Sequence, residues 1–246
     1  MRISWIPFNS AYYSVPSELM RAGAVGPPLR ITTTWSVLEH PQGVVVIDTG
    51  APVDDPAAEM APGADVAARL RAIGLTTGNV RYVVNTHLHV DHVGGNRELA
   101  DSTFLVDRDE LAYACAPADP RLAAEYSLSL LAPDTLRYSP LPAGDHDLFG
   151  DGSVVVLTSP GHAAGHRSVL LRLPSSGTVL ISGDAVWTRS NLAPDTLPGL
   201  LWSQAAYRRS RERLRRLAET EGARWFFSHE PSCFAEEGWL EGVEYD

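Results

Sequence analysis

The sequence predicts a single α/β domain spanning residues 1–246, in which two β-sheets pack face to face and helices cover the outside. Three observations predict this fold class. A chain of 246 residues is long enough to bury one full core. Short runs rich in valine and isoleucine, bounded by turn residues, recur along the chain and favour strands. Helical patterns interrupt these runs, giving strands, a helix, more strands, a second helix and a last strand.

The predicted strands follow directly from these apolar runs. The segment Ile31–Val37 alternates, with Ile31, Thr33, Trp35 and Val37 on one face, which is typical of a half-buried strand. The remaining predicted strands are short, largely apolar runs that are typical of buried strands. They are residues 44–47, 80–84, 154–157, 179–181 and 225–227.

The first predicted helix begins after Asp65, whose side chain is suited to cap a helix amino terminus. Val66, Leu70 and Ile73 then share one face, and Gly74 can end the helix.

The second predicted helix spans Ser203–Glu221 and carries an apolar stripe with arginines on its other faces. The stripe is Tyr207, Leu214, Leu217 and Ala218. The arginines indicate either a nucleic-acid patch or a solvated helix face paired through Glu212, and the net charge favours the solvated face.

The segment 108–139 combines leucines at helical spacing with interrupting prolines. It is expected to form short helices between strands, as a lid over a pocket or as a plain connector.

Composition excludes several classes of protein. Twenty basic against thirty acidic side chains give a net charge of −10, which argues against a nucleic-acid partner. The amino-terminal segment has no secretory pattern, and no run of eighteen apolar residues occurs, so a cytoplasmic protein without a membrane anchor is expected. The two cysteines, Cys115 and Cys233, form no motif and predict no disulfide framework.

The candidate metal-binding side chains are concentrated in the segment Asn85–Asn96, which reads NTHLHVDHVGGN. His87, His89, Asp91 and His92 fall within six residues, directly after a predicted buried strand. Imidazole and carboxylate are ligands for divalent metals such as zinc, and alternate residues of an extended segment point the same way. The segment therefore predicts a metal site at the end of that strand.

The run HLHVDH resembles the HxHxDH signature of the metallo-β-lactamase superfamily. Further matches follow in the order that this family requires: His162 in SPGHAAGH, Asp184 in ISGDAVW and His229 in FFSHEP. Each of these residues comes directly after an apolar run. The matches extend from Asp48 to Pro231, which is most of the chain.

This resemblance implies a four-layer αββα sandwich that binds two Zn²⁺ ions, although other divalent metals are also compatible. The first metal would be held by His87, His89 and His162, and the second by Asp91, His92 and His229. Asp184 would bridge the two metals together with a water or hydroxide.

Other residues of the matched segments are expected to play supporting roles. Asp48 in IDTG resembles the aspartate that orients a ligand histidine from below the metal loop, with a simple turn residue as the alternative. His166 is expected to be structural or to support a ligand. His40 and His146 lie in polar, turn-like surroundings and are predicted to be exposed and without a role.

Among the branches of the superfamily, the local sequence most resembles the N-acyl homoserine lactonases. The resemblance implies that a bridging hydroxide attacks the carbonyl of a small lactone or ester, with Asp91 and Asp184 as catalytic residues and Asp91 as proton donor. Thioester hydrolysis, phosphoester or organophosphate hydrolysis, and metabolite binding without turnover remain as alternatives. The sequence leaves open whether the chain forms a homodimer.

Two features bear on the substrate. Trp187 occupies the position, three residues after Asp184, where these lactonases usually carry a tyrosine that contacts the substrate carbonyl; it is therefore expected to be a substrate-binding residue. Aromatic and apolar residues near the amino terminus are candidates for an acyl-chain pocket, with a core role as the equal alternative. They are Trp5, Phe8, Tyr12, Tyr13 and Met20.

Overall fold

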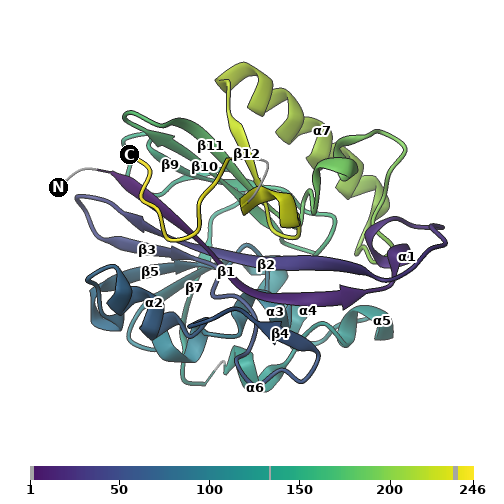
Figure 1. Cartoon of the computed structure of the whole chain (residues 1–246), viewed down its shortest axis with the longest axis horizontal. Coiled ribbons are helices and arrows are strands. Elements are labelled where there is room, and N and C mark those ends of the chain that lie inside the picture. The colour runs from purple at the N-terminus through teal and green to yellow at the C-terminus, as the bar shows by residue number, and fades with distance from the viewer. Residues whose placement is uncertain (1–2, 133, 235–237) are drawn as a thin grey trace.

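The computed structural model describes residues 3–132, 134–234 and 238–246. Two β-sheets pack face to face, and helices lie on the outer side of each sheet (Figure 1). The predicted αββα sandwich is confirmed.

The first sheet has the strand order β4-β1-β2-β3-β5-β6-β7. Neighbouring strands from β4 to β3 are antiparallel, whereas β3, β5, β6 and β7 are parallel to one another. The strands are β1 (Ser4–Val15), β2 (Leu29–Glu39), β3 (Val44–Ile47), β4 (Ala58–Met60), β5 (Val80–Val84), β6 (Thr103–Asp107) and β7 (Arg137–Leu141).

The second sheet has the order β12-β11-β10-β9-β8. Only the pair β11 and β12 is parallel among its described strands. The strands are β8 (His146–Asp147), β9 (Val154–Thr158), β10 (Arg167–Leu173), β11 (Gly177–Gly183) and β12 (Arg224–Phe227).

One helix packs on the outer face of each sheet. Val66 and Leu70 of α2 (Val66–Ala72) pack against the first sheet, and Leu214 and Ala218 of α7 (Gln204–Glu221) pack against the second. The other helices are α1 (Ser17–Met20), α3 (Val90–Val93), α4 (Arg108–Cys115), α5 (Pro120–Ala123) and α6 (Leu128–Leu131), with 3₁₀ turns at Thr77–Asn79, Asn96–Leu99, Arg189–Leu192 and Pro231–Phe234. No helix among the described residues is long and apolar enough to cross a membrane.

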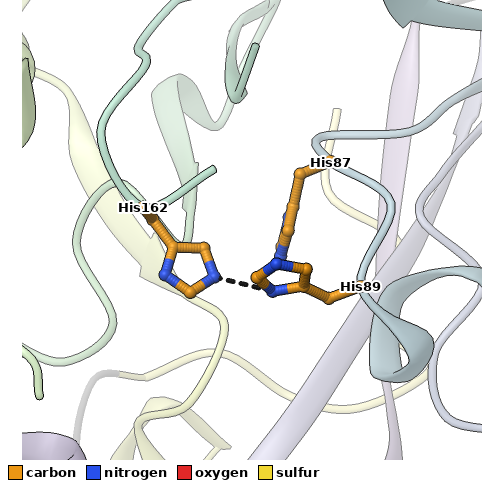
Figure 2. A group of neighbouring side chains, drawn as sticks. All are labelled: His87, His89 and His162. Carbon is orange, nitrogen blue, oxygen red and sulfur yellow. Dashed lines mark hydrogen bonds between the residues drawn. The ribbon is translucent and has the colours of Figure 1, made fainter. Parts of the chain in front are cut away.

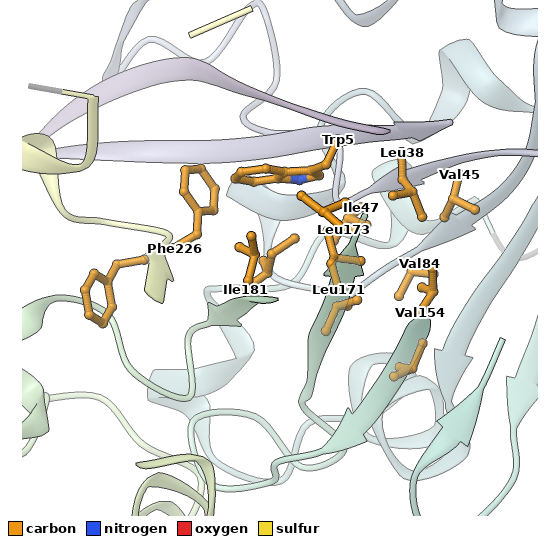
Figure 3. Packing of buried hydrophobic residues seen from close by; sticks show 14 of the residues in the cluster. Trp5, Leu38, Val45, Ile47, Val84, Val154, Leu171, Leu173, Ile181 and Phe226 are labelled. Atoms are coloured by element: carbon orange, nitrogen blue, oxygen red, sulfur yellow. The ribbon is translucent and has the colours of Figure 1, made fainter. Parts of the chain in front are cut away.

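The main core lies between the two sheets. Ile47 and Val84 from the first sheet meet Leu171 and Ile181 from the second, and Trp5 of β1 packs edge-on against the ring of Phe226 with 5.0 Å between ring centroids (Figure 3). The alternating inward residues of both sheets thus form one continuous apolar layer.

Strand direction determines where polar loops can gather. The parallel strands β3 and β5 end next to each other, and so do the parallel strands β11 and β12. The chain therefore leaves all four strands toward one end of the sandwich, where the predicted ligands lie.

The prediction for His40 is wrong. Its side chain is buried at 1% exposure, its Nε2 lies 2.9 Å from Asp151 Oδ2, and its ring stacks on Phe149 with 3.8 Å between centroids. His40 therefore connects the β2–β3 turn of one sheet to the β8–β9 turn of the other. His146, also predicted to be exposed, is half-buried in β8.

Candidate metal centre

The segment that follows β5 carries four of the predicted ligands. His87 and His89 lie in its extended part, and Asp91 and His92 lie in the short helix α3. Gly94 ends this helix where the chain passes very close to the loop after β3. A Cβ atom at Gly94 would lie 2.2 Å from the backbone of Ala51, so this close approach requires a glycine.

The structure brings all seven predicted ligands together from four loops. One group of three residues, here called the first trio, is His87, His89 and His162 (Figure 2). A second trio is Asp91, His92 and His229. Within each trio the candidate ligand atoms lie within 4.8 Å of one another, as required to hold one ion.

Asp184 lies between the two trios. Its Oδ2 is 3.3 Å from His162 Nε2 of the first trio and 3.1 Å from His229 Nε2 of the second. Its Oδ1 is 3.3 Å from His92 Nε2. This carboxylate is thus within reach of both trios at once.

The histidines of the first trio are held neutral. Burial lowers the pKa of His162 to about 4 and lowers the pKa values of His87 and His89 well below their usual range. A histidine must be unprotonated to bind a metal, so these side chains are ready to act as ligands near neutral pH.

The second trio lies in a concentration of negative charge. Burial alone would lower the pKa of His92, but the carboxylates of Asp91, Asp184 and Asp48 outweigh it and raise the pKa well above its usual range. The pKa of His229 is raised in the same way, chiefly by Asp184 against the effect of burial. A divalent cation would neutralise this charge.

The donor set fits divalent metal ions. Nε2 of His87, His89 and His92 is buried and has no hydrogen-bond partner in the part of the chain that the structure describes. Buried polar atoms are normally satisfied, and an imidazole nitrogen without a partner, beside other imidazoles and carboxylates, is the arrangement that a metal ligand requires.

Asp48 supports the second trio from below. Its carboxylate accepts hydrogen bonds from His92 Nδ1 at 2.8 Å and from the backbone amide and hydroxyl of Thr86, both at 2.7 Å. Its backbone is left-handed, with φ of 56°, a conformation that aspartate tolerates better than most residues. These contacts agree with a residue that orients a ligand histidine.

Two residues that hold Asp184 were only partly predicted. The Asp184 amide donates to His166 Nε2 at 2.8 Å, so His166 Nδ1 carries the proton that is donated to Ser159 Oγ at 2.9 Å. Burial lowers the pKa of His166 to about 3, which keeps the ring neutral. Ser228 Oγ donates to Asp184 Oδ1 at 2.6 Å. The role of Ser228 was not predicted, although its position directly before the predicted ligand His229 could have indicated it.

A cavity of about 140 Å³ opens beside the two trios. Apolar and aromatic residues form much of its wall, Asp55 and Glu125 add carboxylates, and Asp91 is the most exposed ligand that lines it, with a side chain 19% exposed. No arginine lines the cavity among the described residues, and the sequence contains no lysine. The apolar and aromatic lining residues are Tyr13, Val15, Leu19, Ile31, Val90, Trp187 and Leu200.

Of the amino-terminal candidates for an acyl-chain pocket, only Tyr13 lines this cavity. Trp5 and Phe8 are core residues, and Met20 packs with Trp187 behind the wall. Tyr12 lies under the guanidinium of Arg30, at 3.5 Å from the ring centroid.

Trp187 stands between the trios. Its ring centroid lies 5.1 Å from that of His162 and 5.3 Å from that of His229, with both histidines edge-on to it. The indole is 3% exposed, and its Nε1 has no partner among the described residues. The wall beside both trios is therefore aromatic, and the indole N–H is buried behind it.

Comparison with known proteins agrees with this geometry. Residues 30–220 match the family model of the metallo-beta-lactamase superfamily. The N-acyl homoserine lactonase AttM of Azorhizobium caulinodans is 34% identical over 85% of this chain and 86% of its own length. An N-acyl homoserine lactonase of Bacillus thuringiensis is 27% identical over 88% of this chain and 90% of its own length.

Solved structures support the same fold. A crystal structure of a quorum-quenching N-acyl homoserine lactone lactonase superimposes with a TM-score of 0.85 at 24% identity, covering 96% of this chain and 95% of the other. The match of the family model, together with the relative at 34% identity, establishes that the chain belongs to the metallo-β-lactamase superfamily, in which it is similar to the N-acyl homoserine lactonases.

Proposed function

We propose that this chain is a dinuclear-metal hydrolase that opens the ester ring of a lactone, with an N-acyl homoserine lactone or a similar molecule as substrate, and that residues 1–246 act as one functional domain. The observation that carries the proposal is the position of Asp184, which is within 3.3 Å of histidines from both trios at the wall of an aromatic cavity. The curated relatives of this chain are named as lactonases, which supports the choice of substrate.

The proposed ligand assignment follows the trios. His87, His89 and His162 would hold one ion, Asp91, His92 and His229 the other, and Asp184 would bridge them. Five histidines and two carboxylates are a donor set suited to zinc, which we propose as the metal. When bound, two such ions supply a hydroxide nucleophile near neutral pH and polarise the substrate carbonyl.

The protein side chains have separate tasks in this reaction. The Asp184 carboxylate accepts a hydrogen bond from Ser228 Oγ, and its backbone amide donates one to His166, so both the side chain and the backbone of this residue are fixed. Asp91 faces the cavity, where it would take the proton released by the attacking hydroxide and pass it to the ring oxygen as the ester bond breaks. Trp187 is proposed to bind the substrate by forming the aromatic wall beside both trios.

The lining of the cavity favours a neutral substrate. Asp55 adds negative charge to its wall, and Glu125, whose pKa burial raises to about 7, adds part of a further charge near neutral pH. No arginine lines the cavity among the described residues. An anionic phosphodiester or a glutathione thioester would meet this charge, whereas a neutral lactone would not.

A panel of substrates tests the proposal. Purified protein reconstituted with zinc should open N-acyl homoserine lactones, with slower turnover of a glutathione thioester and of an aryl phosphodiester or phosphotriester. The comparison of kcat/KM across the panel decides between the three reactions. Asp184→Asn, prepared in the same way, is the control for adventitious hydrolysis. Faster turnover of the phosphoester or the thioester would reject the lactonase, and no turnover at full metal content would indicate a binding protein.

A further inference from the structure

We infer that Glu110 is a positioning residue for the first trio, and that it holds the two ligand-bearing loops of this trio in register. The inference rests on the metal centre of the proposed function but does not depend on the choice of substrate. Glu110 lies in α4, away from the ligand motifs in sequence, and its side chain is fully buried at 0% exposure.

The carboxylate of Glu110 accepts hydrogen bonds from three separate segments. Oε1 accepts from the amide of Leu88 at 3.1 Å and from the hydroxyl of Tyr126 at 3.1 Å. Oε2 accepts from the amide of Gly165 at 3.0 Å. The carboxylate is therefore shared between the two loops and the segment that carries Tyr126.

These partners are significant because of their neighbours in the chain. Leu88 stands between the ligands His87 and His89, and Gly165 follows the ligand His162 by three residues. One carboxylate thus fixes the backbone of both loops that supply the first trio. It makes no such contact with the loops that carry His229 or Asp184 among the described residues.

Tyr126 extends the same support to a ligand ring. Its aromatic ring packs edge-on against His89, with 4.7 Å between centroids, while its hydroxyl donates to Glu110. The carbonyl of Glu125 accepts from the amide of Val90 at 2.9 Å. The segment that carries Glu125 and Tyr126 therefore supports the ligand loop after β5, on the side of the first trio.

The geometry around Gly165 shows how closely the parts fit. A Cβ atom at this position would lie 2.5 Å from the amide nitrogen of Glu110 and 2.6 Å from Asp107 Oδ1. The loop after β9 thus packs directly on the start of α4, and this close approach requires a glycine at position 165.

Glu110→Gln is the test variant, because it keeps the shape of the side chain but replaces one acceptor oxygen with a donor. That donor must face a backbone amide or the tyrosine hydroxyl. The readout is zinc affinity, measured by titrating the metal-free protein with zinc against a chromophoric chelator. Weakening of one of the two binding events by about 10- to 100-fold is expected, with the other changed less than about threefold.

Glu98→Gln is the matched control. Glu98 also accepts two backbone amides, from Val66 at 3.3 Å and from Ala67 at 3.0 Å, but these cap α2 and do not touch a ligand loop. It should lower the melting temperature without changing either zinc affinity. Tyr126→Phe, which removes a single donor, is the milder variant to use if Glu110→Gln does not fold, and it should weaken the same binding event by a smaller factor.

The outcomes separate the two proposals. If the test variant, Glu110→Gln or Tyr126→Phe in its place, binds zinc as tightly as the control Glu98→Gln, then Glu110 is merely structural and the inference is overturned. Wild-type protein that binds zinc but opens no lactone would reject the proposed substrate and leave the role of Glu110 intact. Wild-type protein that binds no zinc would reject both.

Discussion

Asp48 and Asp184 contact opposite nitrogens of one imidazole ring. Asp48 Oδ2 lies 2.8 Å from His92 Nδ1, and Asp184 Oδ1 lies 3.3 Å from His92 Nε2. The bond to Asp48 holds Nδ1 as the donor, so Nε2 is the nitrogen that faces the cluster and would bind a metal.

Asp48→Asn should therefore weaken metal binding by the second trio. The amide can accept only through one oxygen, so it cannot serve His92 and both groups of Thr86 at once. A loss of about 10- to 100-fold in the affinity of one zinc ion is expected. The zinc titration with a chelator checks it, and unchanged affinity for both ions would reject an orienting role for Asp48.

Purified protein should contain close to two divalent ions per chain by elemental analysis. Removing them with a chelator should lower the melting temperature, because a ligand at 100 times its Kd stabilises the native state by about 3 kcal/mol. Readdition of zinc should restore both the melting temperature and the activity. One ion per chain in a metal-saturated sample would contradict the assignment of two trios.

Asp184→Asn should lower the turnover rate by several orders of magnitude while leaving the fold intact. Its carboxylate pKa lies well below the usual range, because His229, His92 and His162 outweigh the effect of burial, and an amide cannot supply this charge. Activity and metal content are measured together, with Asp101→Asn, at an exposed turn position shortly after the 3₁₀ turn Asn96–Leu99, as the control. Near-normal turnover with both metals retained would refute the bridge.

Trp187→Tyr should preserve or modestly raise activity on homoserine lactones. The phenol would add a donor at a position where the indole N–H is buried, and one hydrogen bond changes the rate by about tenfold or less. Trp187→Phe removes the donor but keeps an aromatic wall, so the difference between the two variants isolates the hydrogen bond. Trp187→Ala should chiefly change the preference among acyl chains. Identical kcat/KM values for all three variants across the substrate panel would contradict a substrate-binding wall.

His40→Ala should destabilise the fold without affecting metal content. The variant loses the bond to Asp151 and the stacking on Phe149, at a cost of about 2 kcal/mol, in the range usual for buried polar residues. Denaturant unfolding measures it, and His146→Ala, at a half-buried histidine of β8, should change stability by less than about 0.5 kcal/mol. Equal stability of the two variants would show that the contact contributes nothing.

Much of the fold could be predicted because many of its buried strands are short, largely apolar runs. The predicted strands at 44–47 and 80–84 coincide with β3 and β5, and Asp65 caps α2 by accepting from the amide of Ala68. Strand β1, in contrast, was not predicted. Its polar residues Asn9 and Ser10 are buried at 1% and 0% exposure, so the segment lacks the alternation that marks a half-buried strand.

Some residues of the site could likewise be predicted from the sequence, and others could not. The ligands could be predicted since they are concentrated in motifs directly after strands. Glu110 and His40 could not, because each acts through partners far away in the chain: Gly165 is 55 positions from Glu110, and Asp151 is 111 positions from His40. A lone acid in a short helix or a lone histidine in a turn has the same local sequence whether or not such a partner exists.

The seven ligands come from both sheets, and this has a consequence for how the protein unfolds. His87 and His89 follow a strand of the first sheet, whereas His162 follows a strand of the second. An ion bound by these three residues would join the two halves of the sandwich at one end, and the contact of His40 with Asp151 joins them at the other. The sheets could then separate only after metal bonds break, so bound metal would act mainly by slowing unfolding, as kinetic stability rather than as faster folding.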